Sequence, residues 1–591
     1  MVFGFGKAKQ DTKVAARAPA PAPAPAAAKP VAPGVASATP AASTIKRGWM
    51  PGQMQDWKFT VNKVLEHAHY NHGNREVVTR SVEGPIVRST YSELYWRARK
   101  CSNALLADGV QQGDRIATLA WNTQRHIETW YGTMCIGAVL HTLNPRLFPE
   151  QIAWIINHAE DTHVFYDITF QPIIEAIKDK VPSVKHWIVL TDAAHKPQSS
   201  IANLRTYEEY IAPHSTDVVW GDFPEDTACG LCYTSGTTGD PKGVLYSHRS
   251  NILHTMIGMQ KDAIGIGAAD VTLPVVPMFH ANAWGLAFSG PATGSKLVLP
   301  GAKMDGESIY ELLDGEKVTF TAAVPTVWLM LLQYLESTNK KLPHLKRVVI
   351  GGSAVPERIL RAFEENYQVE VVHAWGMTEM SPLGSLGSMT EGVLAQDHDT
   401  IIKYKLKQGR PPFGVEMRIV DDDGKDLPHD GKAAGHLIVR GPAVAKGYFK
   451  GAGGNILDKD GFFDTGDVAN MDELGYMQIT DRAKDVIKSG GEWISSIDIE
   501  NIAVGFPGVK VAAVIGVHHP KWEERPVLVL DLYEDADVTE EAMRAHLAPA
   551  IAKWWMPDRI VFDTVPLTAT GKIDKKALRS RYLNCLDEAA A

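Results

Sequence analysis

Short runs of β-forming residues alternate with helical stretches between about residue 54 and residue 480, and this alternation restricts the chain to a layered α/β fold. The expected strands include residues 115–120, 186–190, 228–233, 296–299 and 347–350. The expected helices between them include residues 92–108, 150–158 and 327–337. We therefore expect α/β sheets layered with helices.

The chain is too long for one ordinary core, because it has 591 residues. Residues 1–48 form an Ala/Pro-rich basic tail that cannot bury enough apolar surface to fold. Residues 49–481 are expected to form a large domain, in which dense turn signals beyond residue 409 predict a small β subdomain. A charged junction at 482–484 precedes a small α+β domain at 485–591.

The N-terminal tail has several interpretations. It begins Met-Val-Phe-Gly-Phe-Gly-Lys, which lacks the apolar core and the cleavage site of a signal peptide. A disordered tail is the simplest interpretation. The alternatives are a docking peptide for a partner or a membrane surface, and an organellar transit peptide.

Composition excludes some classes of function. The net charge of −9 does not favour nucleic acid as a partner. No apolar run reaches the roughly 18 residues of a transmembrane segment. Five cysteines in so long a chain predict no disulfide framework and favour the cytoplasm, with attachment to a membrane or an assembly through the tail as an alternative. Cys229 and Cys232 have C-x-x-C spacing, but we interpret them as buried apolar residues, because no second pair could complete a metal site.

The segment Tyr-Thr-Ser-Gly-Thr-Thr-Gly-Asp-Pro-Lys-Gly-Val at residues 233–244 is suited to binding phosphates. Its glycines let the backbone approach an anion, its hydroxyl groups donate hydrogen bonds, and its lysine adds a positive charge. It is not a Walker A loop, because Lys242 is followed by Gly243 instead of Ser or Thr. Another fold must therefore hold the phosphates.

Three distant segments add to this loop. They are Trp-Gly-Met-Thr-Glu at 375–379, Thr-Gly-Asp at 465–467 and Thr-Gly-Lys at 570–572. Each segment alone is weak evidence of function, because such short motifs occur by chance. The three segments in this order, after the 233–244 loop, are a specific signal. The set resembles the adenylate-forming superfamily of acyl-CoA synthetases, luciferases and peptide-synthetase adenylation domains, from about residue 54 to residue 580.

Further segments are similar to the bacterial medium- and long-chain fatty-acid CoA ligases, namely residues 277–285, 351–356, 485–495 and 521–526. Trp375 departs from the tyrosine of many members but keeps a flat face for stacking. The resemblance implies a large N-terminal adenylate-forming domain, a small mobile C-terminal domain, and an AMP-forming fatty-acid CoA ligase that uses ATP, CoA and Mg²⁺.

The resemblance also implies roles for individual residues. Lys572, Glu379 and Thr234 would be catalytic, and Thr234 and Glu379 would place Mg²⁺. The residues implied for ATP and AMP are Thr234, Ser235, Gly236, Thr237, Thr238, Gly239, Lys242, Gly352, Ser353, His373, Ala374, Trp375, Gly376, Thr378, Glu379, Asp467, Arg482, Lys484, Lys488 and Trp493.

The remaining implied roles concern the acid, CoA and domain movement. His280 and Trp284 would line and gate the acyl pocket, residues Ser489, Gly490 and Gly491 would face CoA, and Lys484 would be the hinge. Similar ligases also imply a homodimer. Chain length cannot be read from the sequence, because one methylene in an apolar pocket changes binding by only about 1–3 kcal/mol.

Other functions remain alternatives at this point. The acid could be a thioether, an aryl acid or a steroid side-chain acid, or the enzyme could load a carrier protein. A luciferase-like oxygenase and a scaffold with a vestigial site are disfavoured, the latter because Lys572, Glu379, Asp467 and the 233–244 loop are all present.

Overall fold

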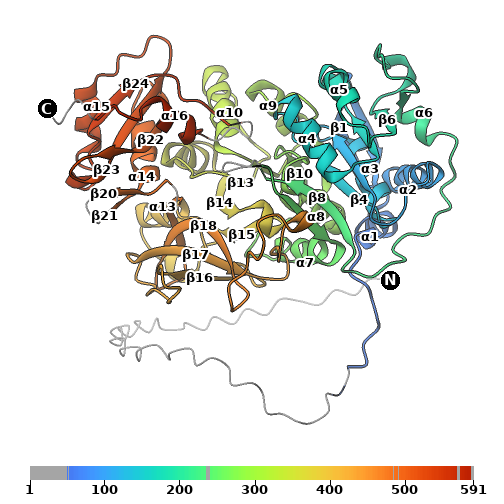
Figure 1. The fold of residues 1–591 in the computed structure, drawn as a ribbon, viewed down its shortest axis with the longest axis horizontal. Helices are drawn as coiled ribbons and strands as arrows, with labels where there is room; N and C mark the ends of the chain where they lie inside the picture. Colours follow the sequence, from blue (N-terminus) through green and yellow to red (C-terminus); the bar gives the residue numbers. More distant parts are fainter. Residues whose placement is uncertain are drawn as a thin grey trace, which may run out of the picture. The chain divides into compact units, whose positions relative to one another are not determined.

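The computed structural model describes residues 50, 52–234, 240–482, 485–489, 492–568 and 573–586. The chain divides into two units, residues 1–57 and residues 58–591. The helices and strands that the structure describes all lie in the second unit (Figure 1). The predicted hinge residue Lys484, the Gly490-Gly491 pair, Lys572 and most of the phosphate loop (235–239) lie outside the described residues.

The first sheet is formed mainly by parallel strands. Within the described residues its order is β7 (Arg205–Thr206), β6 (His186–Val189), β5 (His163–Tyr166), β3 (Arg115–Leu119), β4 (Val139–Thr142), β8 (Ala228–Tyr233) and β9 (Gly243–Ser247). Only β8 and β9 pair in antiparallel fashion here. The 233–244 loop connects these two strands.

The second sheet is also largely parallel. Within the described residues its order is β15 (Leu383–Leu386), β14 (Glu370–Gly376), β13 (Arg347–Gly351), β12 (Phe320–Ala323), β10 (Val271–Pro274), β11 (Lys296–Leu299), β1 (Glu76–Arg80) and β2 (Ile86–Thr90). The pairs β14–β15 and β1–β2 are antiparallel.

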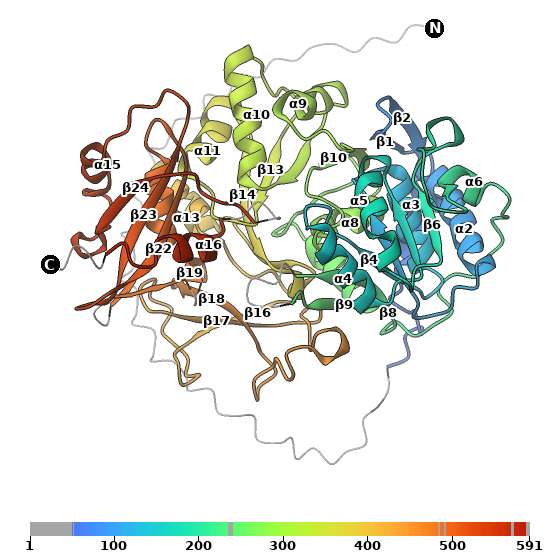
Figure 2. The ribbon, with the colours of Figure 1, turned by 45° about the horizontal axis from the view of Figure 1, so that its top comes forward.

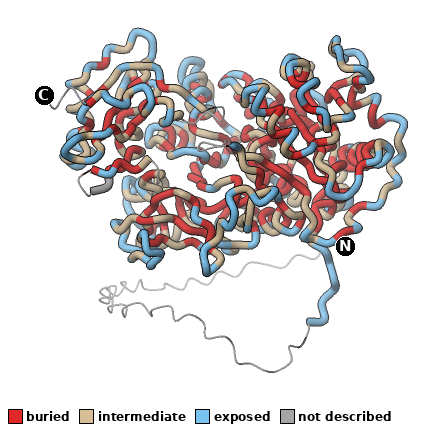
Figure 3. Tube along the Cα trace, viewed as in Figure 1, coloured by how far each residue is buried: buried red, intermediate tan, exposed pale blue. Residues whose placement is uncertain are grey.

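The main core lies between these two sheets. Successive residues of a strand point to opposite faces, so Val349 of β13 joins the core between the sheets while Val348 joins the core beneath α9 (Gly306–Gly315) and α10 (Pro325–Thr338). Figure 2 shows α9 and α10 together beside β10 and β13. The first sheet repeats the pattern, since Phe165 faces the shared core and Val164 faces the layer of α4 (Pro149–Ala159) and α5 (Gln171–Ile177). Figure 3 shows buried residues gathered in the interior of the second unit and exposed residues at its surface.

A third, smaller sheet follows in the chain. Its described strands are β16 (Glu416–Val420), β17 (Ala434–Arg440), β18 (Phe463–Met471) and β19 (Met477–Arg482), all antiparallel. The last sheet contains β20 (Ile487–Ser489), β21 (Glu492–Ile494), β22 (Val509–His519), β23 (Glu523–Leu532) and β24 (Arg559–Phe562). The same part of the chain contains helices α14 (Ser496–Val504), α15 (Glu540–Leu547) and α16 (Lys575–Arg581).

The predicted elements are confirmed with small shifts at their ends. The strand expected at 228–233 is β8, and the helix expected at 92–108 is α2 (Tyr91–Ala107). Thr90 and Glu93 form a capping box that begins α2, because each satisfies a backbone N–H group of the other. Among the residues that the structure describes, no helix has the length and apolarity needed to cross a bilayer. Cys229 and Cys232 are free and buried, as we interpreted them.

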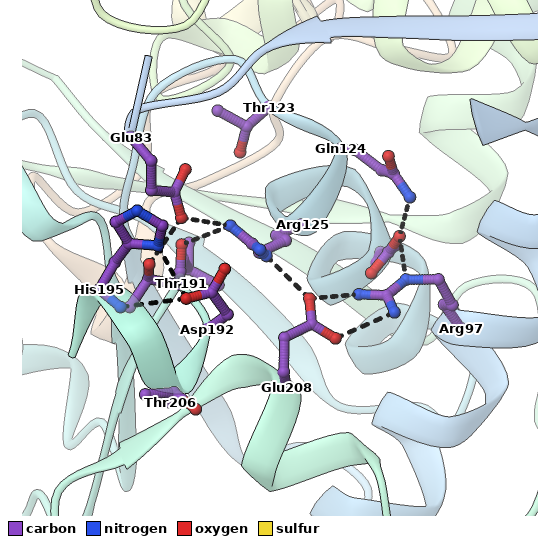
Figure 4. A network of polar contacts seen from close by, with 12 residues as sticks. Glu83, Arg97, Thr123, Gln124, Arg125, Thr191, Asp192, His195, Thr206 and Glu208 are labelled. Carbon is purple, nitrogen blue, oxygen red and sulfur yellow. Dashed lines mark hydrogen bonds and ion pairs between the residues drawn. The ribbon is translucent and has the colours of Figure 1, made fainter. Parts of the chain in front are cut away.

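A polar network joins α2, α3 (Gln124–Met134) and α6 (Tyr207–Ile211) of the region around the first sheet (Figure 4). Arg125 of α3 contacts Glu83 at 2.6 Å and Glu208 of α6 at 2.9 Å. Arg97 of α2 reaches Glu208 at 2.8 Å and the buried Glu128 at 2.8 Å. Glu83, Glu128 and Glu208 are each paired with an arginine, so these ion pairs tie α2, α3 and α6 together.

Candidate active site

The described part of the second unit contains a cavity with a volume of about 1540 Å³. The carboxyl ends of β10, β12, β13 and β14 line it through Val275, Ala323, Gly351 and Trp375. Ligands in open α/β sheets bind at this edge, beyond the carboxyl ends of the strands. The cavity also receives residues of the third sheet and of α14.

The two ends of the phosphate loop lie together at the cavity. The Thr234 N–H group donates to the Lys242 carbonyl at 2.9 Å, and the Lys242 N–H group approaches Thr234 Oγ1 at 3.4 Å. Both residues line the cavity. The structure therefore places the lysine and one predicted hydroxyl of the loop at the same wall.

Glu379 follows the end of β14, in a short 3-10 turn at Thr378–Met380. Gly376 permits this turn, because a Cβ there would lie 2.0 Å from the Pro382 carbonyl oxygen. Thr378 and Glu379 line the cavity, and both are largely buried. The Tyr448 hydroxyl donates to Glu379 Oε1 at 2.7 Å, and the Ala445 N–H group donates to the Glu379 carbonyl at 2.7 Å. Burial raises the pKa of the Tyr448 phenol, which keeps it protonated and able to donate.

Trp375 and Asp467 are in direct contact. The Trp375 indole N–H group donates to Asp467 Oδ2 at 3.0 Å, and Arg482 Nε donates to Asp467 Oδ1 at 2.8 Å. Trp375 and Arg482 line the cavity, whereas the buried Asp467 lies behind them. The sequence predicted all three residues but not this bond between an aromatic ring and a carboxylate.

The other predicted nucleotide residues divide into two groups. Gly352, Ser353 and Ala374 line the cavity. His373 is buried, with Nδ1 at 2.9 Å from the Leu406 carbonyl, and burial lowers the pKa of this imidazole to about 4. Its side chain is not among the residues that line the cavity. A nucleotide contact for His373 therefore stays a prediction.

The predicted residues of the C-terminal segment are only partly described. Lys488 is exposed, and its N–H group donates to Glu524 Oε2 at 3.0 Å. Ser489 is buried and accepts a hydrogen bond from Arg525 at 3.2 Å. The Trp493 side chain lies outside the described part of the chain.

His280 and Trp284 both line the cavity, on an unusual turn. Residues 281–284 all have positive φ angles, from 42° to 59°, so four consecutive residues with side chains are left-handed. The turn directs the tip of the Trp284 ring toward β13, where Cη2 would lie 3.2 Å from a Cβ on Gly351. The sequence predicted the aromatic residue but not the left-handed backbone.

Two residues at the cavity were not anticipated. Tyr448 contacts Glu379 from a position 69 residues later in the chain. Lys575, on α16, contacts Glu500 at 2.8 Å and also lines the cavity. No local motif marks Tyr448, whereas Lys575 could have been suspected from its position near the Thr-Gly-Lys segment.

Comparison with known proteins agrees with this arrangement. Residues 65–449 match the family model of AMP-binding enzymes, and residues 498–572 match that of the AMP-binding enzyme C-terminal domain. The 3-methylmercaptopropionyl-CoA ligase of Ruegeria lacuscaerulensis is 47% identical over 91% of this chain and 100% of that protein. The medium-chain-fatty-acid–CoA ligase of Ectopseudomonas oleovorans is 45% identical over 90% of this chain and 98% of that protein.

The fold is also that of a solved ligand complex. The crystal structure of ATP-bound MatB from Rhodopseudomonas palustris has a TM-score of 0.75 and 25% identity, and covers 89% of this chain and 99% of that chain. The sequence matches and the structural match therefore point to the same family. The chain belongs to the AMP-binding enzyme family and, within it, to the AMP-forming acyl-CoA ligases.

Proposed function

We propose that the protein converts a medium- to long-chain fatty acid to its CoA thioester. The observation that supports this substrate class is the apolar edge of the second sheet, where Val275, Val276, Ala323, Val324 and Val349 line the cavity. None of these five side chains can pair with a second carboxylate. An acid with one carboxylate and an apolar tail fits such a wall best.

A thioether acid is the second candidate. A relative at 47% identity is named for 3-methylmercaptopropionate, and a thioether sulfur is nearly as apolar as a methylene group. The same aliphatic wall therefore suits both acids. Cavity shape, more than polarity, would separate them.

The reaction would have two steps. The acid carboxylate attacks the α-phosphate of ATP and releases pyrophosphate, and the CoA thiol then attacks the acyl-adenylate and releases AMP. Two anions meet in the first step, so charge neutralisation and positioning supply much of the catalysis. We assign this task to Lys572 at the α-phosphate and to the 233–244 loop at the β- and γ-phosphates.

A divalent cation fits the chemistry of the two residues proposed for it. The Thr234 hydroxyl and the Glu379 carboxylate are oxygen donors on the wall of one cavity, and Mg²⁺ prefers oxygen ligands. When bound, Mg²⁺ would neutralise phosphate charge. Trp375 would offer adenine a flat face, and Asp467 would accept hydrogen bonds from the ribose.

The proposed domains follow the predicted boundaries. Residues 485–591 would move about Lys484, first to bring Lys572 to the acid and then to present residues 489–491 to CoA. The tail at 1–48 would take no part in catalysis. A homodimer is also proposed, and light scattering at several protein concentrations would test it.

The experiment that tests the proposal is a panel of acids. We would measure pyrophosphate exchange and CoA thioester formation with acids from acetate to palmitate, with 3-(methylthio)propanoate, and with aryl and steroid side-chain acids. The highest kcat/KM is expected with a medium- or long-chain acid. Highest turnover of 3-(methylthio)propanoate would select the second candidate, and an aryl or steroid preference would overturn both.

The matched control is Lys572→Ala. This variant should lose acid-dependent pyrophosphate exchange but still bind ATP. If exchange persisted, the assigned role of Lys572 would be wrong. In the acid panel, the wild-type enzyme could also catalyse pyrophosphate exchange without consuming free CoA. That outcome would indicate that the enzyme loads a carrier protein instead.

A further inference from the structure

Tyr448 is held between two parts of the candidate site that are far apart in sequence. Its hydroxyl donates to Glu379 Oε1 at 2.7 Å. The ammonium of Lys242, at the end of the phosphate loop, lies 5.1 Å from the centroid of its ring. One side chain thus contacts both the carboxylate after β14 and the lysine before β9.

The segment that precedes Tyr448 also forms hydrogen bonds with the turn that contains Glu379. The Ala445 N–H group donates to the Glu379 carbonyl at 2.7 Å, and Ser381 Oγ donates to the Ala443 carbonyl at 2.9 Å. Residues 443–448 therefore follow the turn at 379–381 as a strap. The strap presents the Tyr448 hydroxyl to the carboxylate instead of leaving it in solvent.

A second tyrosine contacts the same turn at a different atom. The Tyr246 hydroxyl donates to the Thr378 carbonyl at 2.8 Å, and Tyr246 is buried. Its hydrogen bond is to the backbone of the turn, whereas that of Tyr448 is to the Glu379 carboxylate. Tyr246 therefore supports the backbone of the turn, whereas Tyr448 contacts the carboxylate. Replacing each tyrosine in turn would distinguish the two effects.

A carboxylate that binds a cation must keep one oxygen oriented and available. The Tyr448 hydroxyl occupies Oε1, and Glu379, Thr234 and Lys242 all line the same cavity. Groups that orient a metal ligand in this way typically change metal affinity by about 10–100-fold when they are removed. Removing the hydroxyl would let the carboxylate rotate.

We propose that Tyr448 is the positioning residue for Glu379 in binding the metal–nucleotide complex. Its hydroxyl holds Oε1 so that Oε2 remains for the cation. Its ring holds the Lys242 ammonium at the same wall, where it can meet the phosphates of the nucleotide. This inference rests on the proposed role of Glu379 as a metal ligand.

The test is Tyr448→Phe, which removes the hydroxyl and keeps the ring. Binding of Mn²⁺ to the full-length enzyme would be followed by electron paramagnetic resonance with ATP present and no acid added, so that no turnover contributes. We expect the half-saturating Mn²⁺ concentration to rise about tenfold or more. Binding of ATP in the presence of EDTA should stay within about twofold, because the ring still contacts Lys242.

Tyr246→Phe is the matched control. It removes one tyrosine hydroxyl from the same turn and should lower the unfolding temperature without shifting the Mn²⁺ concentration. An equal shift in both variants would mean that the turn has merely loosened, and would overturn the positioning role. An unchanged Mn²⁺ affinity in Tyr448→Phe, with thermal unfolding intact, would also overturn it.

Glu379→Gln separates this inference from the function on which it rests. If Glu379→Gln weakens Mn²⁺ binding and Tyr448→Phe does not, only the role of Tyr448 is wrong. If neither variant affects Mn²⁺ binding, the metal site itself is misassigned. If both weaken it, and the double variant is no weaker than Glu379→Gln alone, Tyr448 acts through Glu379.

Discussion

At the scale of single residues, the bond between Trp375 and Asp467 shows how a substitution in a familiar motif can have a consequence outside it. The indole N–H group reaches a buried carboxylate 92 residues away, at 3.0 Å. A tyrosine has no donor at the same place on its ring. The tryptophan thus links the proposed adenine platform to the proposed ribose ligand.

We expect Trp375→Phe to reduce the free energy of unfolding by roughly 1–3 kcal/mol, because a buried carboxylate loses one donor. The KM for ATP should rise severalfold as Asp467 loses its orientation. Urea unfolding and pyrophosphate exchange would measure the two effects. Trp220→Phe removes an indole donor to Ser102 and should affect stability alone; a similar rise in KM there would contradict the explanation.

His126 allows a test of pH dependence. Its Nε2 accepts from the Trp130 indole at 3.0 Å, its Nδ1 lies 2.9 Å from the Trp121 carbonyl, and burial lowers its pKa from 6.5 to about 4. Between these pH values the unfolded chain binds a proton that the folded protein does not bind, so this contribution to stability is lost as pH falls.

We expect the wild-type protein to lose up to about 1.4 kcal/mol more stability per pH unit than His126→Gln over this interval. Chemical unfolding at a series of pH values would measure both slopes. Parallel slopes would show that His126 does not titrate with a lowered pKa.

At the scale of elements, the turn at 281–284 carries backbone strain next to the cavity. Ala281, Asn282, Ala283 and Trp284 are all left-handed, and this conformation costs about 1–2 kcal/mol for each residue with a Cβ atom. Such strain is typical of functional sites, where the surrounding structure over-determines the backbone. The turn begins after the loop that follows β10 and leads into α8 (Leu286–Thr293).

We therefore expect Ala283→Gly to be neutral or slightly stabilising. Relief of the strain should offset the loss of one buried methyl group, worth about 0.8 kcal/mol. Ala98→Gly, at an equally buried position in α2, should destabilise the protein, because glycine also weakens a helix by about 0.5–1 kcal/mol. Equal destabilisation by the two changes, in urea unfolding, would argue against strain.

At the scale of the whole molecule, a charged cluster joins the segments on either side of the predicted hinge. Lys575 contacts Glu500 at 2.8 Å, and these side chains are 11% and 12% exposed. Asp481 Oδ2, before the hinge, accepts from the Ser496 N–H group at 2.7 Å, and Lys575 contacts Ser496 Oγ at 2.5 Å. Arg579 contacts Asp485 at 2.6 Å.

We expect Lys575→Met to lower the free energy of unfolding by about 3 kcal/mol, because it leaves Glu500 with an uncompensated charge. Combining it with Glu500→Gln should restore part of the loss, since both partners are then neutral. Arg579→Met, at a more exposed pair, should cost less than about 1 kcal/mol. A double variant no more stable than Lys575→Met would show that the pair is not coupled.

Local patterns in the sequence were enough to predict the layers, the order of the motifs and the family. Periodicity placed β8 and α2 almost to the residue, because buried strands and amphipathic helices have local patterns. The phosphate loop, Glu379 and Trp375 were predicted because family motifs are contiguous. These features depend on residues close together in the chain.

Which distant groups meet depends on the tertiary structure. It brought Tyr448 to Glu379, Asp467 to Trp375 and Lys575 to Glu500, and it made residues 281–284 left-handed. His373 belongs to the predicted nucleotide segment but is not among the residues that line the cavity. Such contacts depend on sheet register and on packing between separate elements, and no local run of residues encodes them.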